Sequence, residues 1–271
     1  MLSDITIGQY YKADSLIHKL DARTKILLTL WFIVMIFLCK NFFSLLFVLL
    51  FTALTVLLSK VAFRMFFKSL KPIVPIIVFT SVLNMFYIKD GSALFTLGSF
   101  SVTDKGVATA VFMSVRIIAL IITSSILTYT TVPTQLTDAI EKLLSPLKVF
   151  HIEVHTLAMM MTLALRFIPT LIEEIERITN AQKARGADLE NGKLKERVKA
   201  MIPILIPLFV SAFSRAYDLA FAMSCRCYRG GEGRTRMKQM KMGTRDILAF
   251  VTFVISTAAV VLLNIYFKAV I

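Results

Sequence analysis

Long apolar runs constrain this chain more than any other feature, because several are long enough to cross a bilayer. Four such runs occupy residues 26–59, 72–88, 107–132 and 247–267. A helix rises about 1.5 Å per residue, so roughly 20 apolar residues cross a hydrocarbon core about 30 Å thick. The first run is broken at Lys40 and Asn41, which predicts two short antiparallel helices, and Pro75 predicts a kink in the second run. The sequence therefore predicts an all-α polytopic membrane protein with about five spans.

Composition and charge agree with a membrane protein. Hydrophobic residues make up 57% of the 271 residues and charged residues only 18%, which is too apolar for an ordinary soluble domain. A net charge of +14 would suggest nucleic acid binding in a soluble protein. In a membrane protein, basic residues collect in cytoplasmic loops and face anionic lipid headgroups. We therefore expect membrane lipid, and not nucleic acid, to neutralise this charge.

The charges of the connecting segments predict the orientation. Residues 60–71 contain four basic side chains and no acid, whereas residues 89–105 balance two lysines against two aspartates. The positive-inside rule places the first segment in the cytoplasm and the second outside. The N-terminus is then cytoplasmic in a multi-pass protein of the cell membrane. This interpretation divides the chain into four membrane helices within 1–132, a cytoplasmic domain at 133–245 and a last span within 246–271.

Arg116 lies well inside the apolar run 107–132. A charged residue at this depth is costly and usually faces a polar partner or marks a functional site. Snorkelling to the outer surface is a strained explanation for this position. We expect Arg116 to pair with a polar group inside the bundle, and we favour a ligand-binding role less.

Residues 133–245 show helical periodicity almost throughout, which is unusual for a loop between spans. Helices are predicted over residues 133–150, 154–185 and 195–228. Pro146 disturbs the end of the first helix, and Pro169 predicts a bend in the second. The third contains the 13-residue apolar run MIPILIPLFVSAF, which is too short to span and holds two prolines. It therefore predicts a buried or interfacial helix.

The second and third of these helices end in the same way. An apolar stripe with spacings of three and four continues into an arginine, first in Ile168, Leu171, Ile175, Ile178, Gln182, Arg185 and Leu189, and again in Ala212, Ala216, Leu219, Met223 and Arg226. Glycines follow both. A C-cap explains this pattern, because glycine ends helices and a cation suits the last turn. A docking role explains it equally well, because a guanidinium offers five donors to a partner's carboxylates or carbonyls.

The chain contains the stretches NAQKARGADLENGK and AMSCRCYRGGEGRTR, together with YYKADSLIHKLDARTKI, IEKLLSPLKVF and MMMTLALRFIPTLIEEIERI. Together they resemble the transmembrane T component of energy-coupling factor (ECF) transporters, whose paired Ala-Arg-Gly-type signatures match the first two stretches. The resemblance covers nearly the whole chain. It is looser at Cys225-Arg226-Cys227, where the family often has Ala-Arg-X.

The resemblance implies a non-catalytic subunit of an ATP-driven importer of vitamins or other micronutrients. It implies that two nucleotide-binding ATPase subunits dock on Ala184, Arg185, Gly186, Cys225, Arg226 and Cys227. ATP and magnesium would be bound by those subunits, and this chain would hold no cofactor. The apolar faces of the same helices would bind a small membrane-embedded substrate-binding S component, and the compound transported would be selected by that subunit.

Three consecutive methionines, Met159, Met160 and Met161, are candidate contacts for the S component. Flexible thioethers suit a surface that accepts differently shaped partners. Ordinary helix packing or lipid contact explains them equally well.

Motifs for other chemistry are weak. A phosphate-binding loop needs G-x-x-x-x-G-K-[ST], and the nearest match, from Gly186 to Leu194, is one residue too long and lacks the hydroxyl. His151 and His155 lie four residues apart with Glu153 between them, but no third ligand stands out, so no metal site is expected.

Two other functions stay open. A stand-alone channel or secondary transporter would place its substrate site among the spans, with Arg116 as the candidate residue. A polytopic membrane enzyme, which we favour less, would have residues 155–172 re-entrant and His151, Glu153 and His155 in its active site.

The predicted orientation is tested by cysteine labelling with a membrane-impermeant maleimide, in a chain whose native cysteines are replaced by serine. A cysteine at Ser99 is expected to react in intact cells, whereas one at Asn191 should react only after permeabilisation, because the basic segments stay inside. The reverse labelling pattern would overturn the topology.

Overall fold

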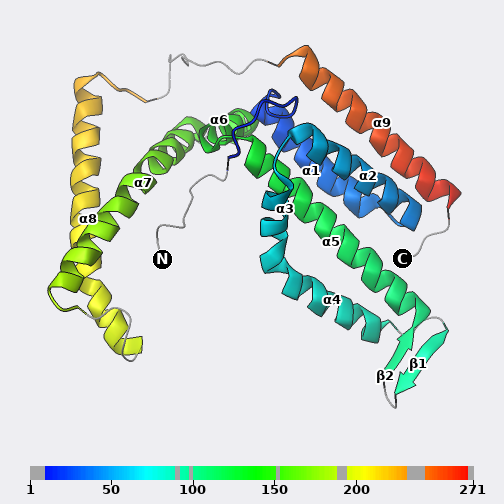
Figure 1. The fold of residues 1–271 in the computed structure, drawn as a ribbon. Coiled ribbons are helices and arrows are strands. Elements are labelled where there is room, and N and C mark those ends of the chain that lie inside the picture. Colours follow the sequence, from blue (N-terminus) through cyan, green and yellow to red (C-terminus); the bar gives the residue numbers. More distant parts are fainter. Residues whose placement is uncertain are drawn as a thin grey trace. The chain divides into compact units, whose positions relative to one another are not determined.

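Helices form nearly all of the structure, a computed structural model that describes residues 10–88, 92–97, 100–150, 153–187, 194–230 and 242–267. The chain divides into two units. The bundle unit comprises residues 8–139 and 239–271, and the paired-helix unit comprises residues 1–7 and 140–238. Figure 1 shows the elements of both units in the order of the sequence.

Among its described residues, the bundle unit contains six complete helices, a 3₁₀ turn and one small hairpin. Its helices are α1 (Ala22–Leu38), α2 (Phe42–Ser59), α3 (Phe63–Leu70), a 3₁₀ turn (Lys71–Ile73), α4 (Val74–Tyr87), α5 (Asp104–Thr130) and α9 (Thr244–Tyr266). The predicted break at Lys40 and Asn41 is confirmed. Pro75 does not kink a helix, because it lies in the first turn of α4, where a missing N–H costs nothing.

A short antiparallel hairpin lies between α4 and α5, in the segment where the sequence predicted only a loop. It consists of β1 (Ala93–Leu97) and β2 (Phe100–Thr103), with Leu97 opposite Phe100 and Thr96 opposite Ser101. Both runs are rich in aromatic and β-branched residues, which favour strands. The all-α class of the protein is unaffected by this small addition.

The paired-helix unit is built on two long helices. After α6 (Pro133–Leu144) and a 3₁₀ turn (Ser145–Phe150), the chain forms α7 (Val154–Ala184) and α8 (Leu194–Cys225). These bounds confirm the three predicted helices and the disturbance at Pro146. α7 and α8 pack against each other. Figure 1 shows α8 changing direction in its first half, which is the half that contains Pro203 and Pro207.

The number of possible spans differs from the predicted five. By length and composition, six described helical segments could cross a membrane: Phe42–Ser59, Phe63–Tyr87, Asp104–Thr130, Val154–Ala184, Val198–Cys225 and Thr244–Tyr266. The six segments include α7 and α8. Each of these helices continues through proline, so that it is longer than the apolar run it contains. Of the six segments, α7 and α8 are the least apolar. The predicted first span, α1, has 17 residues and is not among these six segments, the shortest of which has 18.

Helix α5 lies at the centre of the bundle and contacts α1, α2, α3 and α4. Small residues dominate its buried positions, including Gly106, Thr109, Ala110, Ala119 and Thr123. Such residues let helices approach closely where no water drives their association. At Gly106 an added Cβ would come within 3.0 Å of the Met85 carbonyl oxygen, so this glycine permits the close contact between α4 and α5.

The α1–α2 turn and the end of α9 cap each other. The Asn41 side chain donates to the carbonyls of Leu263 and Phe267, at 3.2 and 2.6 Å, and Asn264 donates to the Leu38 carbonyl at 2.8 Å. The last carbonyls of a helix have no partner within the helix, and a bilayer offers no water to replace one. These two amides therefore fix α9 against the first helical pair.

Replacing Asn41 with leucine is expected to lower the free energy of unfolding by about 1–3 kcal/mol, because two carbonyls lose their donor. Ser124→Ala provides the control, since that exposed hydroxyl bonds only to its own helix at Leu120. Thermal unfolding of the purified chain in detergent measures both. Equal midpoints for the two variants would contradict the capping role.

Candidate functional site

Helix α7 ends in a complete Schellman motif around Arg185. The Gly186 N–H donates to the Lys183 carbonyl at 3.0 Å, and the Ala187 N–H donates to the Gln182 carbonyl at 3.0 Å. Gly186 has a φ of +87°, the left-handed conformation that this motif requires. Arg185 is the last residue before that glycine and is exposed.

Helix α8 ends in the same motif, and each residue of that motif corresponds to one at the end of α7. The Cys227 N–H donates to the Ser224 carbonyl at 2.9 Å, and the Tyr228 N–H donates to the Met223 carbonyl at 3.1 Å. Cys227 takes the left-handed conformation at φ +57°, although its Cβ makes this conformation less favourable than for glycine. Arg226 therefore occupies the place that Arg185 occupies on α7.

In both ends the cap is made by the backbone, not by the arginine. The motif satisfies the terminal carbonyls through main-chain N–H groups, so neither guanidinium is needed for that purpose. Arg185 and Arg226 are both exposed, and the ion pairs found among the described residues include neither. The neighbouring Ala184, Gly186, Cys225 and Cys227 are exposed as well. Two cationic donor groups are thus displayed at two rigid helix ends.

The two ends lie far apart on one antiparallel pair of helices. Arg215 on α8 pairs with Glu174 on α7, with 2.6 Å between Nη2 and Oε2, and the Tyr228 hydroxyl donates to the Met159 sulfur at 3.0 Å. Arg226 therefore lies near the start of α7, and Arg185 lies at its end. Roughly 26 residues of helix separate them, a distance on the order of 38 Å. A small partner that binds one of these helix ends cannot also contact the other.

The three methionines do not share one environment. Met159 is half-buried and accepts the bond from Tyr228, so it belongs to the packing of α7 on α8. Met160 and Met161 are 51% and 42% exposed. Sequence periodicity alone does not separate them, because the difference arises from a contact with the far end of α8.

Helix α8 carries a large exposed apolar stripe that the sequence analysis did not single out. Its members are spaced by three or four residues and are 59–73% exposed: Ile206, Phe209, Phe213, Tyr217 and Phe221. None of the residues in its spanning window is buried in the structure. The helix is therefore not buried within this chain, and with its flanking turns it is long enough to span, contrary to the prediction. A contiguous apolar surface of this kind marks contact with a membrane or another protein.

The weaker sequence candidates do not assemble into a second site. His155 lies 3.2 Å from Glu141, and Glu153 accepts a bond from Thr156 at 2.8 Å. His151 is outside the described residues. Within the described parts of the chain, no group of three potential metal ligands is found.

Arg116 is held inside the bundle unit. Its Nη2 donates to the Cys39 carbonyl at 2.5 Å, at the end of α1, and its guanidinium lies 4.7 Å from the centre of the Phe112 ring. A cation at a helix C-terminus is favoured by the helix dipole, and the aromatic face adds a cation–π contact. These contacts give Arg116 a structural role in joining α1 to α5.

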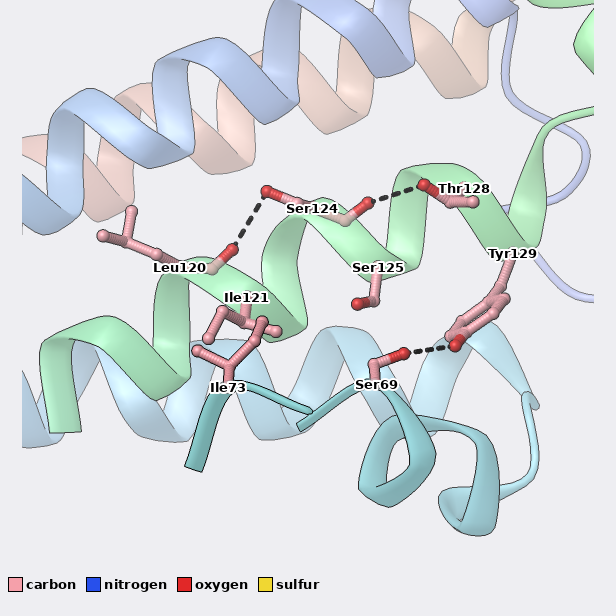
Figure 2. A pocket seen from close by; sticks show the side chains of 8 residues that line it. All are labelled: Ser69, Ile73, Leu120, Ile121, Ser124, Ser125, Thr128 and Tyr129. Atoms are coloured by element: carbon pink, nitrogen blue, oxygen red, sulfur yellow. Dashed lines mark hydrogen bonds between the residues drawn. The ribbon is translucent and has the colours of Figure 1, made fainter. Parts of the chain in front are cut away.

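A hollow of about 410 Å³ lies between α5 and the α3–α4 connection, and it is lined mainly by hydroxyl and aliphatic side chains. Figure 2 shows how its hydroxyls are used: Tyr129 bonds Ser69, while Ser124 and Thr128 donate to carbonyls of their own helix. None of the lining residues carries a charge. The hollow therefore offers little to a charged substrate.

Comparison with known proteins places this chain in a family. The model of the family described as "Cobalt transport protein" (CbiQ) matches residues 13–237. Three relatives are each named "Energy-coupling factor transporter transmembrane protein EcfT". The protein of Ruminiclostridium cellulolyticum is 50% identical over 98% of this chain and 100% of its own length. Those of Clostridium kluyveri and Bacillus subtilis are 48% and 43% identical, over 92% and 95% of this chain and 93% and 97% of their own.

The two caps make a paired prediction about stability. Gly186→Ala is expected to lower the free energy of unfolding by about 1 kcal/mol, because a Cβ is introduced at positive φ. Cys227→Gly should raise it or leave it unchanged, because the strain of a Cβ is relieved while backbone freedom increases. Chemical or thermal unfolding in detergent measures both. Equal destabilisation by the two changes would argue against the shared motif.

Proposed function

The chain belongs to the cobalt transport protein (CbiQ) family and is the transmembrane component of an energy-coupling factor transporter, and we propose that it couples two ATPase subunits to a substrate-binding membrane subunit. In this proposal ATP and magnesium bind to the ATPase subunits, and the present chain holds no cofactor. The ends of α7 and α8 lie on the cytoplasmic side of the cell membrane. The cargo is a vitamin or another micronutrient.

The observation that carries the proposal is the repetition of one motif at two distant helix ends. Each end presents an exposed arginine, Arg185 or Arg226, on the same Schellman backbone. Two helix ends with the same backbone motif would fit two equivalent grooves, such as those on a pair of related ATPase subunits. A guanidinium at the tip of a helix can donate in a fixed fork to carboxylates or carbonyls of such a groove.

The long helices suit the transmission of movement. α7 and α8 have 31 and 32 residues, and the Arg215–Glu174 pair joins them part-way along. A displacement applied at the arginine ends would therefore be carried along the two joined helices. The exposed apolar stripe of α8, together with Met160 and Met161, supplies the surface on which the substrate-binding subunit would lie.

The principal alternative, a stand-alone channel or secondary transporter, has less support. Its candidate residue, Arg116, is already engaged by the Cys39 carbonyl and the Phe112 ring. These contacts account for an arginine inside the bundle without a substrate.

Charge reversal tests the docking role. Arg185→Glu and Arg226→Glu are each expected to weaken association with the ATPase subunits at least 10-fold, because truncating a hot-spot arginine at an interface costs about 2 kcal/mol or more. Uptake by cells should fall with it. Co-purification of tagged subunits and uptake of labelled substrate measure the two effects.

Arg177→Glu is the matched control, because Arg177 is an exposed arginine within the same helix as the Arg185 cap. It should leave both association and uptake close to wild type. Full co-purification and normal uptake in the Arg185→Glu, Arg226→Glu double variant would refute the docking role.

A further inference from the structure

A narrow cavity of about 270 Å³ lies within the bundle unit between α1, α2, α5 and α9. The segment before α1 contributes Leu16, Ile17 and Leu20 to one end of it. Most of the lining is aliphatic or aromatic, with a few threonines and only two charged residues. Those two residues, Lys25 and Arg245, are both basic.

The two ends of the cavity differ in character. Lys25 and Arg245 lie in the first turns of α1 and α9, so they mark the same end of the bundle. Phe32, Phe51 and Phe253 lie further along the helices and contact one another edge to face, with centroids 5.2 to 5.6 Å apart. Seven or eight residues separate the cations from these rings, a depth of about 11 Å, less than one leaflet of the bilayer.

No carboxylate lines the cavity, although Asp21 and Asp246 lie near enough to Lys25 to interact with its charge. Lys25 itself is buried, so Arg245 is the exposed cation at this end. Lys25 Nζ donates to the carbonyls of His18 and Thr130, at 3.2 and 2.8 Å, which leaves one of its three donors. Arg245 is exposed. The neighbouring Asp246 is buried and accepts bonds from the backbone N–H groups of Asp21 and Gly243, so it serves the fold.

We propose that this cavity binds an anionic phospholipid, with one acyl chain between the helices and the phosphate at Arg245 and Lys25. An acyl chain suits an apolar slot that opens into the bilayer, and an anionic headgroup suits a basic rim. The cavity ends beside the last turn of α2, where Leu54, Thr55 and Leu58 line it. The basic segment 60–71 follows directly, which assigns the site to the cytoplasmic leaflet.

The lining favours a lipid chain over a helix of a partner protein. Four helices and the segment before α1 already surround the cavity, and its charged residues lie at one end only, as an acyl chain with a headgroup requires. The bound chain would fill the space between α9 and the first two helices, and so would strengthen the attachment of α9.

The test uses the full chain in nanodiscs of phosphatidylcholine with and without phosphatidylglycerol. Phosphatidylglycerol is expected to raise the unfolding midpoint of the wild type by about 3–5 °C, because a ligand that binds only the folded state stabilises it. Arg245→Ala should lose at least half of this shift. Arg64→Ala is the matched control, since Arg64 is likewise exposed and likewise the second residue of its helix, and it should keep the shift.

Two further measurements distinguish a specific site from general surface charge. Ala249→Phe fills the cavity and should reduce the phosphatidylglycerol that co-purifies with the chain, as measured by mass spectrometry. A photo-reactive residue at Leu54 should give an adduct with the mass of a phospholipid in native membranes. An adduct with another polypeptide would overturn the proposal, as would equal lipid retention and equal midpoint shifts in the wild type, Arg245→Ala and Ala249→Phe.

Discussion

The satisfaction of helix ends is the constraint on which the rest of this structure depends. Terminal carbonyls and N–H groups have no partner within a helix, and a bilayer supplies none. In the bundle unit, side chains meet this need, as Asn41 and Asn264 show where they join α9 to the α1–α2 turn. At the ends of α7 and α8, backbone N–H groups meet it through two Schellman motifs. Because the backbone caps itself there, the guanidinium groups of Arg185 and Arg226 are not needed for capping.

The two units differ in how they use apolar residues, and this difference follows their roles. The bundle buries Phe32, Met35 and Phe112 around the small residues of α5, and it joins α1 to α5 through Arg116. The paired helices instead expose a stripe of aromatic and aliphatic side chains along α8. Such a surface is stable only when lipid or another protein covers it. The exposed stripe of α8 therefore indicates contact with lipid or another protein along this helix.

Most helices could be predicted from the sequence. Features that depend on contacts between residues far apart in the chain could not. Periodicity and the break at Lys40 and Asn41 were strong local signals, so the helices and the α1–α2 turn were predicted closely. The helix through Pro203 and Pro207 was predicted, but its capacity to span a membrane was missed, because the 13-residue apolar run was considered without its flanking turns. The left-handed conformation of Cys227 was not predicted, because this position holds no glycine. The different environments of Met159 and Met160 depend on Tyr228, which lies far away in the sequence.

An experimental structure of the assembled transporter in lipid, resolved well enough to place the side chains of Arg185 and Arg226, would test the docking role directly. We expect each guanidinium to lie in a groove of a different ATPase subunit and to donate to its carboxylates or carbonyls. Contact of both arginines with one subunit, or of either with lipid or open solvent, would rule this role out.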